Sequence, residues 1–138
     1  MNIDSIANGV VIDHISAGRA MRLYELLGLG EVECSVAIIK NVHSEKMGRK
    51  DIIKVDADIP INFDVIGYVD PSATINIIRS GSLVEKRIIG KPETLTNVIR
   101  CKNPRCITSV EQELDHVFKL TDREENVYRC IYCETKAN

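Results

Sequence analysis

The sequence of 138 residues contains no tryptophan, and aromatic residues make up only 4% of it. Because apolar residues still account for 44%, the composition predicts a packed core of aliphatic side chains and excludes a largely disordered chain. No apolar stretch approaches the roughly 20 residues that a membrane helix needs, and the first residues lack the basic start of a secretory signal. We therefore expect a soluble, cytoplasmic protein with no membrane partner.

The sequence also lacks an excess of either charge. Its 18 basic and 20 acidic residues give a net charge of −2, which argues against a broad surface for a polyanion such as nucleic acid. It has no Gly-rich phosphate loop, and no Ser-His-Asp or paired-carboxylate spacing that indicates an enzyme. The residues alone therefore give no motif that predicts an enzyme.

Cysteine is nearly absent from the first 100 residues, where Cys34 stands alone, yet four cysteines lie in the last 38. An odd total fits a disulfide framework poorly. We interpret Cys34, which lies on an apolar stretch, as a small core residue. The Gly- and Pro-containing segment at 90–97 is typical of a linker, so we predict two domains, 1–93 and 94–138.

The first domain shows strand patterns and helix patterns in alternation. A strand precedes a helix, two strands follow, and then come a second helix, a strand and a further strand. This order is typical of a ferredoxin-like α/β sandwich, an α+β fold with an antiparallel sheet and two helices. The predicted strands are 10–15, 34–40, 51–55, 72–78 and 83–89, with helices within 16–30 and 62–69, a long hairpin loop at 41–50 and a turn at 79–82.

The four late cysteines form two close pairs. Four residues separate Cys101 from Cys106, two separate Cys130 from Cys133, and 23 lie between the pairs. Two such pairs on separate turns suit a structural zinc ion with four thiolate ligands, which leaves His116 unnecessary as a ligand. A tail of 38 residues also needs support, because a hydrophobic core alone rarely suffices below about 40 residues. Unrelated buried thiols, two disulfides and a thiolate-bound iron remain as alternatives. We predict a small all-β domain around one Zn²⁺.

Three short segments accompany these cysteine pairs: VIDHI at 11–15, MGRKDIIK at 47–54 and SATIN at 72–76. In this order, and over nearly the full length, the chain resembles the regulatory chains of aspartate carbamoyltransferase, a non-catalytic family of pyrimidine biosynthesis. The resemblance implies a domain that binds CTP, ATP or related nucleotides and a zinc domain that contacts the catalytic chain, with Asn103 at that contact. It also implies pairing with a second regulatory chain in a hetero-oligomer.

The resemblance further implies which residues contact the nucleotide. Asp13 would contact the effector with His14 beside it, Lys50 and Lys54 would approach the ribose or phosphates, and the N-terminal residues would meet the base. Lysine suits a triphosphate because its ammonium is a compact cation. The implied effector set is Ser5, Ile6, Val11, Asp13, His14, Lys50, Lys54, Asn76, Ile78 and Lys86.

Two other function classes fit the cysteine motif less well. A nucleic-acid-binding zinc ribbon is one alternative, but residues 101–138 carry 6 basic against 7 acidic side chains and no run of aromatics. A thiol oxidoreductase or a small-molecule hydrolase is the other, although the Cys130–Cys133 pair does not lie between a strand and the helix that it opens, as such a redox motif requires.

Overall fold

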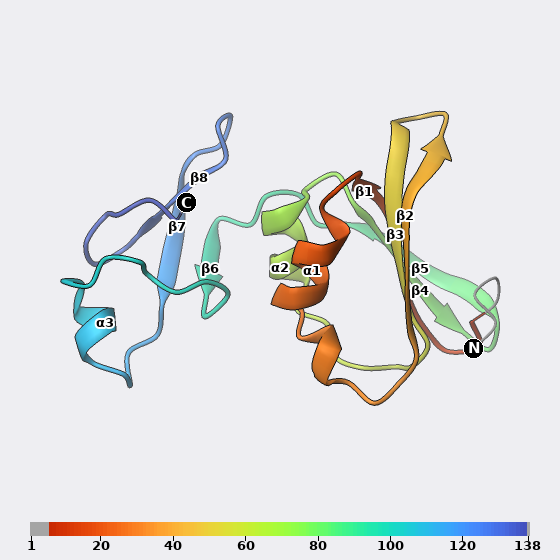
Figure 1. Cartoon of the computed structure of the whole chain (residues 1–138), viewed down its shortest axis with the longest axis horizontal. Coiled ribbons are helices and arrows are strands. Elements are labelled where there is room, and N and C mark those ends of the chain that lie inside the picture. The colour runs from red at the N-terminus through yellow and green to blue at the C-terminus, as the bar shows by residue number, and fades with distance from the viewer. Residues whose placement is uncertain (1–5, 138) are drawn as a thin grey trace. The chain divides into compact units, whose positions relative to one another are not determined.

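The computed structural model describes residues 6–137 (Figure 1). The chain forms two compact units, an N-terminal unit that ends at Gly90 and a C-terminal unit that begins at Lys91. The sequence-based limits of 1–93 and 94–138 stay a prediction. Within the described residues, no helix is long and apolar enough to cross a membrane.

The N-terminal unit is a five-stranded antiparallel sheet with helices on one face (Figure 1). The strand order is β2-β3-β1-β4-β5, so β1 to β4 have the ferredoxin-like arrangement and β5 extends it. The α+β prediction is confirmed. The elements are β1 (Gly9–Ser16), α1 (Ala20–Leu26), η1 (Leu29–Glu31), β2 (Val36–Ser44), β3 (Gly48–Val55), α2 (Phe63–Val69), β4 (Thr74–Arg79) and β5 (Ser82–Ile88).

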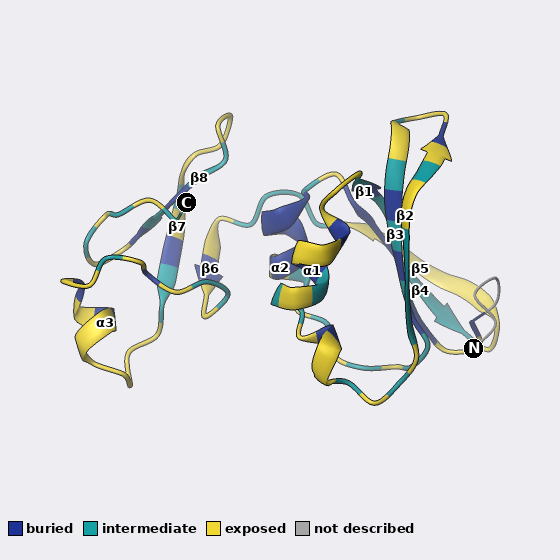
Figure 2. Cartoon of the chain, viewed as in Figure 1, coloured by how far each residue is buried: buried dark blue, intermediate teal, exposed yellow. Residues whose placement is uncertain are grey.

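The core of this unit lies between the helices and one face of the sheet. Ile12 pairs with Ile53 on one side and with Ile75 on the other, and all three side chains are fully buried. In Figure 2 the colour for buried residues lies on α2 and on parts of the strands of the sheet. Because side chains alternate across a strand, the neighbouring residues point to the opposite face. We call that opposite side of the sheet the open face.

Two β-bulges shape the middle of the sheet. The register shifts between Ile12 and Ile15 on β1 and between Ile39 and Val42 on β2. At these bulges His14 and Asn41 have φ values of 56° and 62°, in the left-handed region that few non-glycine residues adopt.

The buried carboxylate of Asp51, on β3, lies next to both bulges. It accepts the backbone N–H of Asn41 at 2.8 Å, of Gly18 at 2.9 Å and of Ala20 at 3.2 Å. Asp51 therefore fixes the β2 bulge and also the first turn of α1, whose N-terminal N–H groups have no partner within the helix.

The β2–β3 hairpin differs from the prediction. We expected a long loop at 41–50, but β2 continues to Ser44 and β3 starts at Gly48, so the loop prediction is wrong. The turn is closed by the hydroxyl of Ser44, which accepts the N–H of Met47 at 3.2 Å. Cys34 precedes β2 and is only partly buried, which contradicts its interpretation as a core residue.

Several local predictions are confirmed. The Asn62 side chain caps α2 by accepting the N–H of Asp64 at 3.1 Å, and α2 ends at Val69 before Asp70 and Pro71. The β4–β5 turn consists of Ser80 and Gly81, which have φ values of 51° and 76°. Two positive φ angles are what a tight hairpin turn of this length favours.

The C-terminal unit is a three-stranded antiparallel sheet in the order β6-β7-β8, as the prediction of a small β domain requires. Its elements are β6 (Thr94–Thr96), the single helical turn α3 (Ile107–Val110), β7 (Val117–Asp122) and β8 (Val127–Cys130). Phe118 pairs with Leu95 and with Cys130 and, together with Tyr128, fills the core. Because β6 lies within 90–97, the predicted linker is wrong over that part.

Candidate metal centre and effector site

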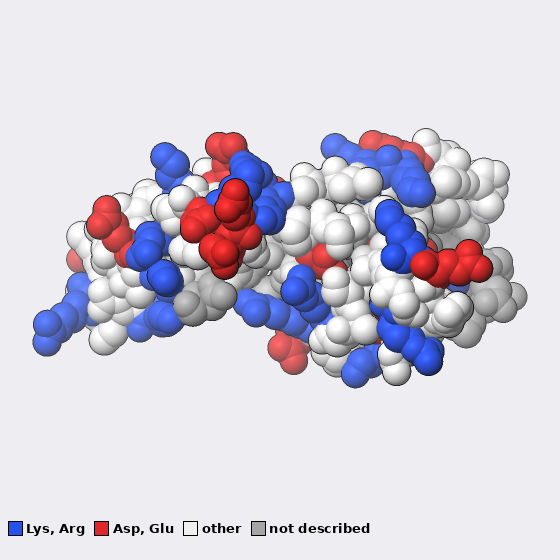
Figure 3. All heavy atoms as spheres, turned by 90° about the horizontal axis from the view of Figure 1, so that it is seen from above, with Lys and Arg blue, Asp and Glu red and all other residues white. Residues whose placement is uncertain are grey.

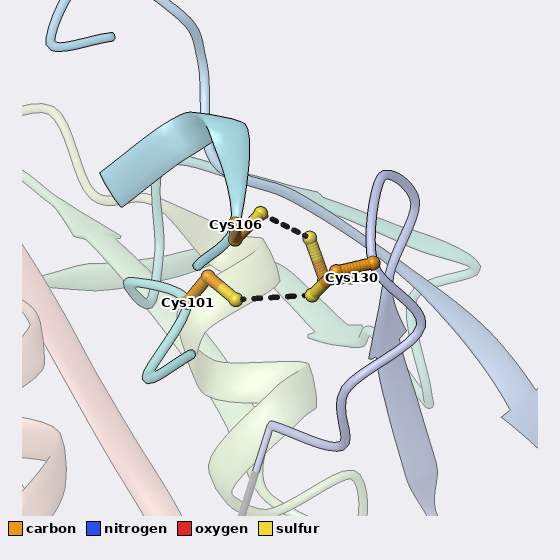
Figure 4. A group of neighbouring side chains, drawn as sticks. Cys101, Cys106 and Cys130 are labelled. Carbon is orange, nitrogen blue, oxygen red and sulfur yellow. Dashed lines mark hydrogen bonds between the residues drawn. The ribbon is translucent and has the colours of Figure 1, made fainter. Parts of the chain in front are cut away.

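The four cysteine sulfurs of the C-terminal unit converge on one point. The Sγ atoms of Cys101 and Cys133 lie 3.5 Å apart and those of Cys106 and Cys130 lie 3.7 Å apart, and all four lie within 4.8 Å of one another. Figure 4 shows sulfurs from the two cysteine pairs pointing toward each other. A tetrahedral zinc ion with Zn–S bonds of about 2.3 Å needs sulfurs about 3.8 Å apart, so the residues present fit this ion.

The disulfide alternative does not match this geometry. A disulfide requires its sulfurs about 2.05 Å apart, and the five cysteines are free thiols. The thiols instead lie on two turns of similar shape. At each cysteine the backbone N–H two positions later, that of Asn103, Thr108, Tyr132 or Thr135, acts to lower the thiol pKa. Hydrogen bonds from such groups offset part of the negative charge of thiolates.

The pKa values of the four thiols indicate that a cation is needed to stabilise all four as thiolates. Burial raises the pKa of Cys101 to about 12 and also raises that of Cys130. The Thr108 hydroxyl lowers the pKa of Cys106, and the Thr135 hydroxyl lowers that of Cys133 to about 6. Because metal binding requires four thiolates in one small space, a divalent ion must supply the charge that stabilises them.

Asn103 organises the first cysteine turn. Its side-chain oxygen accepts the N–H of Arg105 at 3.0 Å, and its backbone oxygen accepts the N–H of Cys106 at 3.1 Å. The Asn103 side chain also helps to lower the pKa of Cys133, on the other turn. Asn103 therefore has a structural role at the metal centre, besides the partner contact that the resemblance implies.

The predicted effector residues lie mainly on the open face of the N-terminal unit. Val11 on β1 pairs with Lys54 on β3 and with Asn76 on β4, and Asn76 pairs with Lys86 on β5. Directly paired residues share a face of the sheet, so these four side chains form one row across four adjacent strands. We call Lys54, Val11, Asn76 and Lys86 the cross-strand row.

An ion pair stands beside this row. The Lys50 ammonium lies 2.9 Å from Asp13 Oδ1, and the two side chains are 16% and 21% exposed. The same oxygen accepts the N–H of His14 at 2.6 Å. Burial raises the pKa of Asp13, but the hydrogen bonds from Lys50 and His14 and their charges outweigh it and hold the pKa below its ordinary value. Asp13 is thus kept as an acceptor-only carboxylate.

The remaining predicted effector residues are placed differently. Ile78 follows Asn76 by two residues on β4 and so shares its face. His14, at the bulge, has its Nδ1 2.9 Å from the hydroxyl of Thr74, a buried residue that sequence reasoning missed. Ile6 is buried, and Ser5 lies outside the described residues.

Comparison with known proteins decides the family. Residues 1–90 match the family described as "Aspartate carbamoyltransferase regulatory chain, allosteric domain", and residues 93–138 match "Aspartate carbamoyltransferase regulatory chain, metal binding domain". The chain belongs to the family of aspartate carbamoyltransferase regulatory chains. As a regulatory chain it is a non-catalytic subunit with an allosteric domain and a zinc-binding domain, as the resemblance implied.

Curated regulatory chains resemble it over nearly their whole length. The chain is 49% identical to the aspartate carbamoyltransferase regulatory chain of Clostridium tetani over 135 residues, which cover 97% of this chain and 94% of the relative. It is 46% identical to that of Clostridium botulinum over 134 residues, covering 97% and 92%. The regulatory chain of Bifidobacterium longum is 40% identical over 137 residues, covering 99% of each.

The surface of this regulatory chain carries charges of both signs. In the face drawn in Figure 3, the acidic and basic side chains of the described residues are interspersed on each unit. This face therefore offers no continuous basic area of the kind that non-specific nucleic-acid binding needs, in agreement with the net charge of −2.

Proposed function

We propose that this regulatory chain binds a nucleotide of the CTP or ATP class on its open face, and that its zinc domain holds the catalytic chain of aspartate carbamoyltransferase. The cross-strand row is the observation that carries the proposal. It gathers residues from β1, β3, β4 and β5 on the side of the sheet opposite the buried Ile12, Ile53 and Ile75.

The charges of the open face suit a triphosphate. Lys54 and Lys86 stand at the two ends of the row, three strand spacings apart, with Val11 and Asn76 between them, and Lys50 lies on the same strand as Lys54. Adjacent strands are about 4.8 Å apart, so the two ends of the row span the length of a nucleotide. The ammonium groups of Lys54 and Lys86, which approach from the two ends of the row, would bind phosphate oxygens as charge-assisted hydrogen-bond donors.

The uncharged groups of the row suit a base or a ribose. Asn76 Oδ1 is buried and has no hydrogen-bond partner among the described residues, an arrangement that costs about 1–3 kcal/mol unless a ligand supplies a donor. An exocyclic amino group, which cytosine and adenine share, is such a donor, and so is a ribose hydroxyl. The ionised Asp13 offers a second acceptor for the same kinds of donor.

The C-terminal unit has the surface that a protein partner requires. Ile107 and Val110 follow the first cysteine pair, Ile131 and Tyr132 lie within the second, and these four side chains are 50%, 69%, 48% and 45% exposed. Apolar residues held in the open beside a rigid metal centre are typical of an interaction site. We assign this surface, with Asn103, to the catalytic chain.

The two sites would act together through two states of the assembly. A nucleotide shifts the balance only as far as its affinity for the two states differs, typically by about 1–3 kcal/mol, and the coupling of equilibrium binding is reciprocal. We further propose that a second regulatory chain pairs with this one through the N-terminal sheet, and that catalytic trimers and regulatory dimers assemble in the cytoplasm, where thiols stay reduced for zinc.

The test uses the full zinc-loaded chain assembled with a catalytic trimer of aspartate carbamoyltransferase. Saturation by aspartate is measured with and without CTP and with and without ATP, for the wild type and for Lys86→Ala. Loss of one charge-assisted contact of about 1.5–3 kcal/mol predicts that Lys86→Ala binds nucleotide about 10- to 100-fold more weakly. Lys46→Ala is the matched control, because Lys46 is an exposed lysine in the β2–β3 turn.

The outcomes separate the parts of the proposal. We expect Lys86→Ala and Lys46→Ala to assemble normally, with only Lys86→Ala losing its response to nucleotide. If the wild-type chain does not bind the catalytic trimer, the partner assignment is wrong. If neither nucleotide changes aspartate saturation of the assembled wild type, the proposed effector site is wrong. It is also wrong if nucleotides change the saturation of Lys86→Ala as much as that of the wild type.

A further inference from the structure

His116 lies beside the metal centre without belonging to the cluster of ligand atoms. The candidate ligand set within the described residues consists of four cysteine sulfurs, which complete a tetrahedral site. The His116 ring nitrogen Nδ1 instead accepts the backbone N–H of Cys101, the first cysteine of the set, at 3.1 Å. A ring nitrogen that accepts a hydrogen bond carries no proton, so the bond selects the tautomer with its proton on Nε2.

The backbone of His116 is itself held in place by Asn97. The N–H of Asn97 donates to His116 O at 2.7 Å, and the N–H of His116 donates to the Asn97 side-chain oxygen at 2.9 Å. The Asn97 amide nitrogen also donates to Asp115 Oδ1 at 2.9 Å. The backbone of His116 is therefore fixed to Asn97, and its ring is fixed to Cys101.

The residues that follow His116 are attached to the second cysteine pair. Val117 O accepts the N–H of Ile131 at 3.1 Å, and Phe118 pairs with Cys130 across β7 and β8. His116 thus contacts the first pair through its ring, while the two residues after it contact the second pair through the backbone. This tripeptide bridges the two turns that must meet around one ion.

We propose that His116 is a positioning residue for the metal centre, which holds the backbone of Cys101 at the place where its sulfur completes the tetrahedral set. The proposal concerns the metal centre alone and does not depend on nucleotide binding. Groups that orient metal ligands without touching the metal typically contribute 10- to 100-fold in metal affinity. Loss of the Nδ1 acceptor should weaken zinc binding by about that factor.

Two amide substitutions test the position of the acceptor. In His116→Asn the side-chain oxygen can occupy roughly the place of Nδ1, whereas in His116→Gln the amide reaches one atom further, toward the place of Nε2. Because both side chains are polar and His116 is partly exposed, we expect both variant proteins to fold. His116→Leu removes the acceptor altogether. Tyr128→Phe is the control for general loss of stability, because it removes the hydrogen bond from the Tyr128 hydroxyl to Pro92 O in the same unit.

The measurements are made on the full chain. Zinc affinity and the rate of zinc transfer to a chromogenic chelator are compared, and Co²⁺ is then substituted to record its ligand-field and thiolate charge-transfer bands. We expect His116→Gln and His116→Leu to bind zinc about 10- to 100-fold more weakly and to alter the Co²⁺ bands. We expect His116→Asn and Tyr128→Phe to stay close to the wild type in both.

Three results would overturn the proposal. Zinc affinity and Co²⁺ bands of His116→Gln that match the wild type would show that the acceptor is unnecessary. Equal losses in His116→Asn and His116→Gln would show that the ring itself matters rather than the acceptor position. An equal loss in Tyr128→Phe would show that zinc release follows general opening of the unit. If His116→Leu does not fold, the Asn and Gln pair still decides.

Discussion

Removal of zinc should unfold the C-terminal unit and leave the N-terminal unit folded. The large apolar side chains that are buried in the C-terminal unit, among the described residues, are Leu95, Phe118 and Tyr128. Each contributes about 1.5–3 kcal/mol when fully buried, which gives about 5–9 kcal/mol in all. A structural zinc supplies an apparent 10–16 kcal/mol. The ion is therefore the larger stabilising contribution, and the apolar core cannot replace it.

The N-terminal unit has no such dependence. Its core includes Ile12, Ile15, Ile53, Val55 and Ile75 from three adjacent strands, all fully buried, together with residues of both helices. Cys34 is its only cysteine, and it lies apart from the metal cluster. Chelation should therefore leave the sheet of this unit intact.

Amide hydrogen exchange of the full chain tests this difference. After treatment with a chelator and a thiol reductant, we expect the amides of β7 and β8 to lose protection while those of β1, β3 and β4 keep theirs. Cys101→Ser should reproduce the effect without a chelator, and Cys34→Ser is the matched control that should change neither unit. Persistent protection of Phe118 and Cys130 in a sample shown to be free of metal would refute the reasoning.

Two further predictions concern the N-terminal unit. Asp70 is buried and accepts hydrogen bonds from Ser16 N at 2.5 Å and from the Ser72 hydroxyl at 2.7 Å; Asp70→Asn should lower the free energy of unfolding by about 2–4 kcal/mol at pH 7 in urea titrations. Burial raises the pKa of Asp70, but these hydrogen bonds outweigh it and lower the pKa below 3.8. The stabilisation is therefore complete above that pH and lost as the pH falls through the folded-state pKa, so an equally steep acid loss in Asp70→Asn would contradict the assignment. Asn62→Ala removes the side-chain cap on Asp64 N and should cost about 0.5–2 kcal/mol by the same titration; an unchanged midpoint would show that the cap contributes nothing.

The sheet of the N-terminal unit could be predicted because its signal is local. Residues 51–55 and 72–78 are short runs rich in isoleucine and valine or threonine, and such runs identify strands without knowledge of their partners. The predicted first strand of the β2–β3 hairpin ends too early, at Lys40, because residues 43, 45, 46, 48 and 49 are mostly polar and exposed. Its strands there are held by pairing with each other rather than by burial, so hydropathy carries no signal for them.

The two candidate sites differ in how much the sequence reveals. The cysteine pairs lie close together in the sequence, so their spacing predicts a shared ion without knowledge of the fold. The cross-strand row consists of residues 11, 54, 76 and 86, and only the sheet register brings them together; resemblance to a family was needed to select them. Asp51 could have been found, because its spacing from Ile53 and Val55 places a carboxylate on the buried face.

The N-terminal unit is therefore stabilised by an apolar core and the C-terminal unit mainly by zinc, and this difference affects regulation. In the N-terminal unit, the residues of the row stand on strands whose other face is already packed, so a nucleotide at the proposed site would meet a preformed surface and lose little affinity to ordering. In the C-terminal unit, the folded structure depends on four thiolates and one ion, so the surface around Ile131 and Tyr132 should exist only while zinc is bound.

A chain without zinc should then bind nucleotide with nearly its full affinity and yet have no effect on the catalytic chain, because the surface proposed to bind that chain is missing. Isothermal titration of CTP into the zinc-free and zinc-loaded chains would measure this separation, and a loss of nucleotide affinity on zinc removal would show that the two units do not fold independently.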